Sequence, residues 1–341
     1  MASTVRHQRL GTWNGVPRVR LATLPTPLER GPDFSGGPRL WVKRDDLTGL
    51  GMGGNKARKL EFLCGRALID GATCLITVGA GQSNHCRMTA AAGAVLGLET
   101  HLVLAGDRPE VLEGNQLLSD RFGAHLHFTG AGPSEWGSLE IAREALTDEL
   151  TAQGLVPSSI PIGGSTAVGS IGYVVAFDEI MSQCRETGFV PRAIVFTSSS
   201  GGTHAGLVAG RATWMASHPG ESVPDVVAIG VAKGVVAGFP SVSELARDAL
   251  SVAGLTGTVD DEAVTVDGRW LGPDYAIPTI ESRAAIGWAA RNGAWVVDDV
   301  YTAKGMAGLL GNIEQGRWGK DDDVVFIHTG GQPEVFVRHE S

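Results

Sequence analysis

The chain is poor in the residues that mark several classes of protein. Its 341 residues include only three tyrosines and four cysteines, Cys64, Cys74, Cys86 and Cys184. The cysteines contain no C-x-x-C pair, so neither a zinc site nor a disulfide framework is indicated. Residues 1–16 lack an uninterrupted apolar run, and no later apolar stretch reaches the length of a membrane span. We therefore expect neither a secretory signal nor a membrane anchor.

Positive charge is also scarce. Lysine and arginine number 28 against 37 acidic residues, which gives a net charge of −9 and disfavours general nucleic-acid binding. Hydrophobic residues make up 43% and charged residues 19% of the chain, as in ordinary globular proteins. The composition predicts a reduced, cytoplasmic protein of enzyme size, with no nucleic-acid or membrane partner.

Glycine is abundant, with 48 residues and no collagen-like period. Apolar strand-like runs at 40–44, 74–78, 101–105, 193–196, 226–231 and 324–328 alternate with glycine turns and helical patterns at 56–70, 84–97, 116–122 and 171–184. This alternation predicts an α/β fold with two open, twisted, mostly parallel sheets flanked by helices. The length suits two lobes. We expect a small α/β domain over 55–164 and a large domain over 1–54 and 165–341.

One lysine stands at a glycine-rich entry to a predicted helix. Lys56 could bind a phosphate, form a Schiff base with a carbonyl, or lie on the surface. A phosphate-binding P-loop needs glycine before the lysine and Ser or Thr after it, whereas Asn55 and Ala57 occupy these positions. Gly53 and Gly54 supply the small neighbours that let a planar cofactor approach a Schiff-base lysine. The P-loop, and with it an ATP-using enzyme, is therefore disfavoured, and the Schiff base stays open.

Two further turns join a strand to a helix, where ligands collect in open α/β sheets. Residues 197–203 form a Ser/Gly/Thr-rich turn whose backbone N–H groups and hydroxyls could hold a phosphate; a tight turn with serine caps is the alternative. Ser83, Asn84 and His85 offer a hydroxyl, an amide and an imidazole, and could equally be a helix cap. The turn at 329–331 is a weaker signal of the same kind.

Other site classes find little support in the sequence. His125 and His127 lie in a probable strand with both rings on one face, but no convergent third ligand can be identified, so we predict no metal site. Ser83 and Ser199 lack the G-x-S-x-G frame of a hydrolase nucleophile. Asn84 stands where a dinucleotide fingerprint needs its third glycine.

Five segments together resemble one family closely. It is the D-cysteine desulfhydrase and 1-aminocyclopropane-1-carboxylate (ACC) deaminase family, pyridoxal-phosphate enzymes with the fold type II of tryptophan synthase β. The resemblance covers about 25–336 and implies a pyridoxal 5′-phosphate cofactor in the cleft between the lobes, a large cofactor-binding domain, and a homodimer. The segments are Lys43-Arg44-Asp45-Asp46, Gly53-Gly54-Asn55-Lys56-x-Arg58-Lys59-Leu60-Glu61, Gln82-Ser83-Asn84-His85, Gly202-Thr203-His204-Ala205-Gly206 and His328-Thr329-Gly330-Gly331.

The resemblance implies roles residue by residue. Lys56 matches the lysine that holds the cofactor and moves the Cα proton, and Asn84 matches the residue beside the cofactor ring and its phenolic oxygen. Ser83 and His85 match the pocket for the substrate carboxylate. Two groups complete the site: the phosphate cup of Ser200, Gly201, Gly202 and Thr203, and the substrate-facing Tyr275 and Tyr301, which could otherwise be core aromatics.

The partners of the pyridine nitrogen separate the family members. ACC deaminases have a glutamate where this chain has Thr302, and the other candidate partner, Thr329, is also a neutral hydroxyl. A less protonated ring is a weaker electron sink, which suits β-elimination better than cyclopropane opening. We expect a carbon–sulfur lyase that converts D-cysteine to pyruvate, ammonia and sulfide. L-cysteate sulfo-lyase or ACC deaminase-like activity and a non-catalytic cofactor-binding paralogue are the alternatives; Glu334 would oppose a sulfonate if it faced the pocket.

Overall fold

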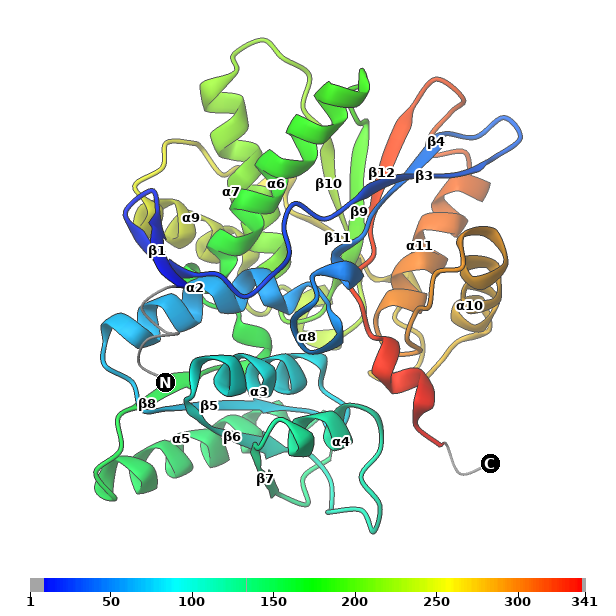
Figure 1. Ribbon diagram of the computed structural model, residues 1–341. Coiled ribbons are helices and arrows are strands. Elements are labelled where there is room, and N and C mark those ends of the chain that lie inside the picture. Colours follow the sequence, from blue (N-terminus) through cyan, green and yellow to red (C-terminus); the bar gives the residue numbers. More distant parts are fainter. Residues whose placement is uncertain (1–8, 133, 339–341) are drawn as a thin grey trace.

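The computed structural model describes residues 9–132 and 134–338 and shows two sheets, each with helices on both faces (Figure 1). The ends of the predicted large domain, 1–8 and 339–341, lie outside this range. The smaller sheet is parallel throughout. Its strand order is β7 (His125–Phe128), β6 (Glu99–Leu104), β5 (Cys74–Gly79) and β8 (Pro157–Ile160).

The larger sheet has six strands and is parallel except for β3 at one edge. An antiparallel hairpin of β1 (Leu10–Trp13) and β2 (Val16–Val19) lies outside both sheets. The mostly parallel fold class is therefore confirmed. The strand order of the larger sheet is β11 (Thr265–Asp267), β10 (Asp225–Gly230), β9 (Ala193–Ser198), β12 (Asp323–Ile327), β4 (Arg39–Lys43) and β3 (Leu28–Asp33).

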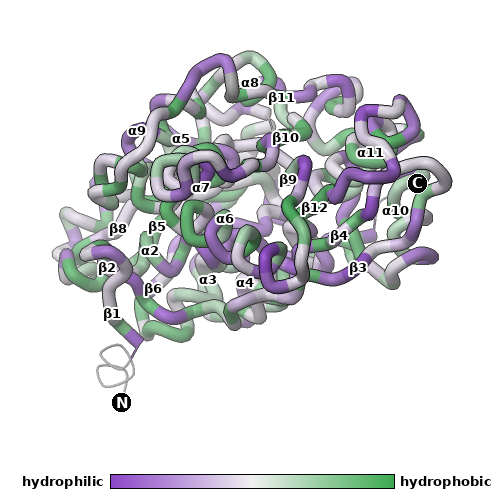
Figure 2. Tube along the Cα trace, turned by 90° about the horizontal axis from the view of Figure 1, so that it is seen from above, coloured by the Kyte–Doolittle hydropathy of each residue, from purple (hydrophilic) through white to green (hydrophobic). Residues whose placement is uncertain are grey.

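Helices cover both faces of the larger sheet because its central strands are apolar on both sides. On one face of the sheet, Phe196 of β9 packs with α6 (Ala167–Thr187), α7 (Gly202–Ser217) and α9 (Val242–Ala253). The preceding residue, Val195, lies on the other face and packs with α10 (Ile280–Gly293) and α11 (Thr302–Glu314). β9 and β12 can be followed through the interior in Figure 2. A single turn of helix, α8 (Lys233–Val236), follows β10.

The smaller sheet is enclosed in the same way. One face carries α3 (Asn84–Leu96) and α4 (Gly114–Arg121), and the other carries α5 (Trp136–Ala152). Ser83 caps α3, its hydroxyl accepting a hydrogen bond from the Cys86 amide at 3.2 Å, and Gly97 ends the helix in a left-handed conformation. In the described part of the chain, no helix is both long and apolar enough to cross a membrane.

The predicted strands and helices are present, with ends shifted by a few residues. α6 begins at Ala167, four residues before the predicted start, because the Thr166 side chain caps it by accepting from the Gly169 amide. The unpredicted elements are the hairpin β1–β2, the strands β3, β8 and β11, and the helices α5, α8, α9, α10 and α11. The strands β8 and β11 are short, with four and three residues. By contrast, α9 buries Val242, Ala246, Ala249, Leu250 and Ala253 at helical spacing, a pattern that the sequence-based prediction did not use.

α2 (Lys56–Ile69) lies between the two sheets and is held by a buried ionic cluster (Figure 1). Arg58, 1% exposed, donates to both oxygens of Asp45 at 2.7 and 2.9 Å and to both oxygens of Glu179 at 2.8 and 3.0 Å. The Tyr173 hydroxyl donates to Asp45 at 2.6 Å. Burial opposes the charge on Asp45, but Arg58 outweighs it and lowers the pKa of that carboxyl. The cluster therefore fixes α2 against β4 and α6.

We predict that Asp45→Asn destabilises the protein by about 3 kcal/mol, because it leaves the buried Arg58 with one carboxylate fewer. Since the folded-state pKa of Asp45 is lowered, its contribution is present above the unfolded-state pKa and is lost as the pH falls through about 4 toward the folded value. The difference between wild type and variant should therefore shrink in acid. Urea unfolding of the cofactor-loaded proteins measures it.

Asp70→Asn, at the C-terminal end of α2, is the matched control. Its pair with Arg66 is exposed (60% and 48%), so the change should cost no more than about 0.5 kcal/mol. Equal losses in the two variants would show that the buried cluster does not hold α2.

Candidate active site

A cavity of about 420 Å³ opens between the two sheets, within the size range of small-molecule sites. It lies where the loops after β5 and β9 approach the start of α2. Every predicted site residue except Gly202 lines it, so tertiary folding brings together segments that are far apart in the sequence. The predicted residues at its wall are Lys56, Ser83, Asn84, His85, Ser200, Gly201, Thr203, Tyr275, Tyr301, Thr302 and Thr329.

Lys56 is the first residue of α2 and reaches the cavity wall. Burial lowers the pKa of its ammonium group from the ordinary value of 10.5 to about 8. No carboxylate in the described structure accepts a bond from its Nζ. A lysine in this state is substantially neutral near pH 8 and is able to attack a carbonyl or accept a proton.

Asn84 is the first residue of α3. Its Oδ1 accepts hydrogen bonds from Asn115 Nδ2 at 3.1 Å and from Arg87 at 3.4 Å. These bonds fix which way the amide is turned and leave Nδ2 available as a donor toward the cavity. This orientation suits the predicted contact with a phenolic oxygen, which accepts hydrogen bonds.

His85 is buried, and its hydrogen bonds indicate its tautomer. Thr77 donates its hydroxyl proton to the Ile160 carbonyl at 2.9 Å, so it accepts from His85 Nε2, also at 2.9 Å. Nδ1 then carries a lone pair and has no hydrogen-bond partner among the residues that the structure describes. Burial lowers the pKa of His85, and the charges of Lys56 and Lys59 lower it further. A neutral ring with Nδ1 as acceptor is poorly suited to binding a carboxylate directly.

The turn before α7 carries the residues that the sequence predicts to form a phosphate cup. Gly201 has a φ of +82°, a left-handed conformation that glycine adopts without strain, and the helix begins at Gly202. A side chain at Gly202 could not be accommodated, because a Cβ there would lie 2.5 Å from Lys59 Nζ. Across the turn, Asn55 Nδ2 donates to the Thr203 hydroxyl at 3.1 Å. The cup therefore combines a helix N-terminus with hydroxyl groups.

Sequence reasoning missed two residues of this cup, Lys59 and Ser165. Lys59 Nζ is fully buried and donates to the Gly163 carbonyl at 2.6 Å and to Ser165 Oγ at 3.1 Å. Ser165 Oγ in turn contacts Ser200 Oγ at 2.8 Å and accepts from the Gly202 amide at 3.2 Å. Burial lowers the pKa of Lys59 well below its ordinary value. The available signal was its spacing, three residues after Lys56 on the same helix face.

The opposite end of the cavity carries hydroxyl groups. Thr302 begins α11 and donates to the Gly330 carbonyl at 2.8 Å, and its oxygen lies 3.1 Å from that of Thr329. Asp298 also lines the cavity, but its two oxygens already accept from the amides of Tyr301 and Thr302 at 2.8 and 2.9 Å. A ring nitrogen at this end would therefore meet neutral hydroxyls.

Tyr275 and Tyr301 contact each other through their hydroxyls, with ring centroids 5.8 Å apart. Burial raises the pKa of both phenols, so they are neutral and can donate a proton. Trp136 packs edge-on against Tyr275 at 5.1 Å. Trp136 and Phe239 line the cavity but were not predicted, since their chain segments carry no motif.

Glu334 does not line this cavity. It lies in an adjoining one behind the two tyrosines, where burial and the neighbouring Asp298 raise the pKa of its carboxyl well above the ordinary value. Its surroundings therefore favour the neutral form over the charged form. The charge-based argument that Glu334 opposes a sulfonate in the pocket therefore does not apply.

We predict that Lys59→Met weakens the binding of pyridoxal 5′-phosphate about 10- to 100-fold, because the predicted phosphate cup loses the amine that donates to the Gly163 carbonyl and to Ser165 Oγ. Titration of cofactor-free protein, followed by absorbance, measures the affinity. Lys320→Met, which removes an exposed lysine, is the control and should leave the cofactor affinity unchanged. Unchanged affinity would contradict the assignment of Lys59 to the phosphate site.

We also predict that covalent attachment of pyridoxal 5′-phosphate to the cofactor-free protein accelerates with rising pH, with a midpoint near 8. The reason is that the neutral amine is the nucleophile, and burial lowers the pKa of Lys56 to about 8. Stopped-flow absorbance across pH 6.5 to 9.5, a range spanning about 1.5 pH units on each side, reports the rate. A midpoint near the ordinary lysine value would contradict the burial of this amine.

Comparison with known proteins agrees with this geometry. Residues 19–330 match the family described as pyridoxal-phosphate dependent enzyme. The chain is 39% identical over 334 residues to D-cysteine desulfhydrases of Salmonella typhi and Salmonella newport, covering 95% of this chain and 96% of each relative.

Solved structures show the same fold. A crystal structure of an ACC deaminase homologue is 34% identical, covers 94% of both chains and has a TM-score of 0.83. Threonine deaminase isoform 2 from Solanum lycopersicum, at 18% identity and TM-score 0.61 over 91% of this chain and 84% of its own, shares the fold. The chain therefore belongs to the pyridoxal-phosphate dependent enzymes, in the D-cysteine desulfhydrase and ACC deaminase family.

Proposed function

We propose that this enzyme catalyses the α,β-elimination of D-cysteine to pyruvate, ammonia and sulfide. The observation that carries the proposal is the single cavity in which Lys56, the phosphate cup and the neutral pair Thr302 and Thr329 meet. The 39% identity to D-cysteine desulfhydrases over 95% of the chain supports it.

The bound cofactor supplies an electron-withdrawing ring that acidifies the Cα–H bond of the amino acid attached to it. Lys56 is placed to hold this cofactor and, once freed by the substrate, to take the Cα proton as a neutral amine. Thr302 and Thr329 offer hydroxyls at the far end of the cavity, where the Asp298 carboxylate accepts from backbone amides. This arrangement favours a reaction in which the electrons left at Cα promptly expel a leaving group from Cβ.

The tyrosine pair is suited to assist that departure. As the Cβ–S bond breaks, its electron pair leaves with sulfur, and the neutral phenol of Tyr275 or Tyr301 can donate the proton that sulfur needs. The remaining three-carbon enamine takes up water and yields pyruvate and ammonia. Lys56 returns the Cα proton to the tyrosine pair or to solvent.

The substrate carboxylate is assigned to the start of α3. Ser83 offers a hydroxyl that already accepts the Cys86 amide and so has its own proton available. Asn84 directs its Nδ2 to the cavity. His85 contributes through packing and its Thr77 bond, since its unpartnered Nδ1 is an acceptor.

The cavity wall also bears on the leaving group. Among its described lining residues, Lys56 is the one cationic side chain, and Lys56 is engaged with the cofactor. A substrate that carries a sulfonate besides its carboxylate would need a second cationic partner. This observation favours cysteine over cysteate.

We predict that the purified enzyme releases pyruvate and sulfide from D-cysteine faster than keto acid from L-cysteine, L-cysteate, D-serine or ACC. β-Chloro-D-alanine, with a good leaving group, should also be turned over. Lys56→Ala should lose the cofactor's visible absorption band and its turnover by several orders of magnitude. The measurement is keto acid by a coupled assay, with sulfide or sulfite determined in parallel.

Three results would contradict the proposal in different ways. Sulfite from L-cysteate as the leading activity would identify a sulfo-lyase. 2-Oxobutanoate from ACC would identify a deaminase. A normal cofactor band without keto acid from any β-substituted substrate would indicate a non-catalytic paralogue.

Location and assembly follow the family resemblance. The four cysteines are free and buried, which supports the proposed cytoplasmic location. The homodimer is proposed from the same resemblance. The division into a small domain over 55–164 and a large cofactor-binding domain over the rest is likewise a proposal, which the placement of the two sheets supports.

A further inference from the structure

Three histidines gather on one face of the smaller sheet, away from the cofactor cavity. His101 of β6 pairs directly with His125 of β7, and His127 follows two residues along β7. Alternation along a strand places all three on the same face. Their rings stack, with centroids 4.7 Å apart for His101 and His125 and 5.3 Å for His101 and His127.

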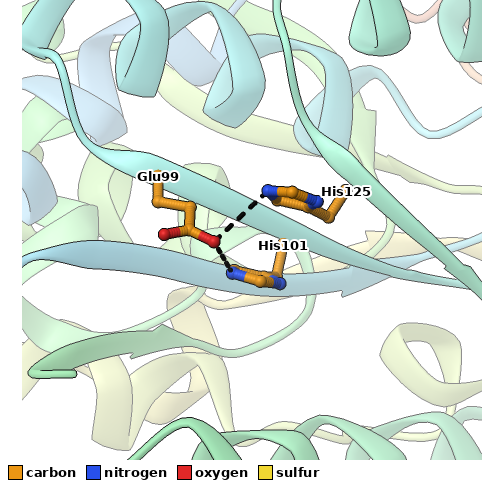
Figure 3. Close-up of side chains that lie close together, drawn as sticks. All are labelled: Glu99, His101 and His125. Atoms are coloured by element: carbon orange, nitrogen blue, oxygen red, sulfur yellow. Dashed lines mark hydrogen bonds and ion pairs between the residues drawn. The ribbon is translucent and has the colours of Figure 1, made fainter. Parts of the chain in front are cut away.

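A carboxylate completes the group. Glu99 precedes His101 by two residues and so projects from the same face of β6. Its Oε1 lies 3.0 Å from His101 Nε2 and 3.2 Å from His125 Nε2 (Figure 3). These three atoms all lie within 4.8 Å of one another. The sequence showed two histidines on one face, and the pairing of strands supplies the ligands it could not identify.

We propose that Glu99, His101 and His125 bind a divalent transition-metal ion, with Zn²⁺ as the best match to their chemistry. Two imidazole nitrogens and one carboxylate oxygen form an established zinc ligand set. Ligands at 2.0–2.1 Å in a tetrahedron lie about 3.3 Å apart, close to the oxygen–nitrogen distances of 3.0 and 3.2 Å.

Exposure and support also suit a metal. The side chains of Glu99 and His125 are 42% and 56% exposed, so an ion can enter from solvent and keep water at a fourth position. His101 is buried, with 6% of its side chain exposed, and its Nδ1 lies 3.1 Å from His127 Nε2. A ligating histidine is commonly oriented by such a bond from its other ring nitrogen. His127 is thus the positioning residue.

The site is structural because of where it lies on the sheet. Glu99 and His125 are the first residues of β6 and β7, whereas the cofactor cavity is built from loops that follow the opposite ends of parallel strands. β7 is a four-residue strand at the sheet edge. A metal would link this strand to β6, and we expect no direct effect on elimination.

Metal occupancy tests the proposal. Chelator-treated, cofactor-loaded enzyme is dialysed against Zn²⁺ and its metal content determined, and Co²⁺ is titrated to follow the visible d–d bands of tetrahedral cobalt. We expect one saturable equivalent per chain. His125→Gln keeps an N–H donor for Glu99 but removes the imidazole ligand, so this equivalent should be lost. His127→Gln should weaken binding about 10- to 100-fold.

His218→Gln is the matched control, because His218 lies at the end of α7 in the larger lobe. The His218→Gln variant should still bind one equivalent of metal per chain. Addition of the metal should not change keto-acid production in any variant. The proposal would be wrong if wild type showed no saturable metal binding, or if wild type and His125→Gln bound the metal equally. Glu99, His101 and His125 would then form only a hydrogen-bonded cluster. Because occupancy is measured directly, the result does not depend on the proposed elimination activity.

Discussion

The geometry of the active site depends on the buried pairing of Arg58 with Asp45 and Glu179. Arg58 stands two residues after Lys56 on α2, while its partners belong to the larger lobe. A charge with 1% exposure is tolerable only when it is fully paired, so α2 has one favourable position relative to β4 and α6. That position places Lys56 at the cavity wall and Lys59 behind the phosphate cup.

The cavity is electrostatically asymmetric. One end combines the partly buried Lys56 and the fully buried Lys59 with a helix N-terminus and suits an anion. The other end offers the hydroxyls of Thr302 and Thr329, because Asp298 is occupied in capping α11. These features would suit a phosphorylated aromatic cofactor: the residues at the start of α7 would hold its phosphate, and Thr302 and Thr329 would offer hydroxyls to its ring nitrogen.

Much of the fold could be predicted from the sequence, because buried parallel strands are apolar throughout and end in glycine-rich turns. Ala193–Ser198 and Cys74–Gly79 show this clearly, and both lead into the predicted site turns. The sequence did not predict a role for Lys59 or Ser165, because a lysine among the charged residues of a helix and a serine in a loop belong to no sequence motif that indicates one. Their roles depend on contact across more than 100 residues.

The sequence by itself determined the family and the cofactor, because the motifs at Lys56, Ser83 and Thr203 are local and chemically specific; the residues that it predicts around the cofactor remain a prediction. The tertiary structure decided which groups are charged and what each one faces. It placed Glu334 in an adjoining cavity where burial raises its pKa, placed the buried Lys59 beside Ser165, and aligned Glu99 with histidines of two strands. The physical reason is that burial and strand pairing, which set pKa values and contacts, arise from segments distant in the chain.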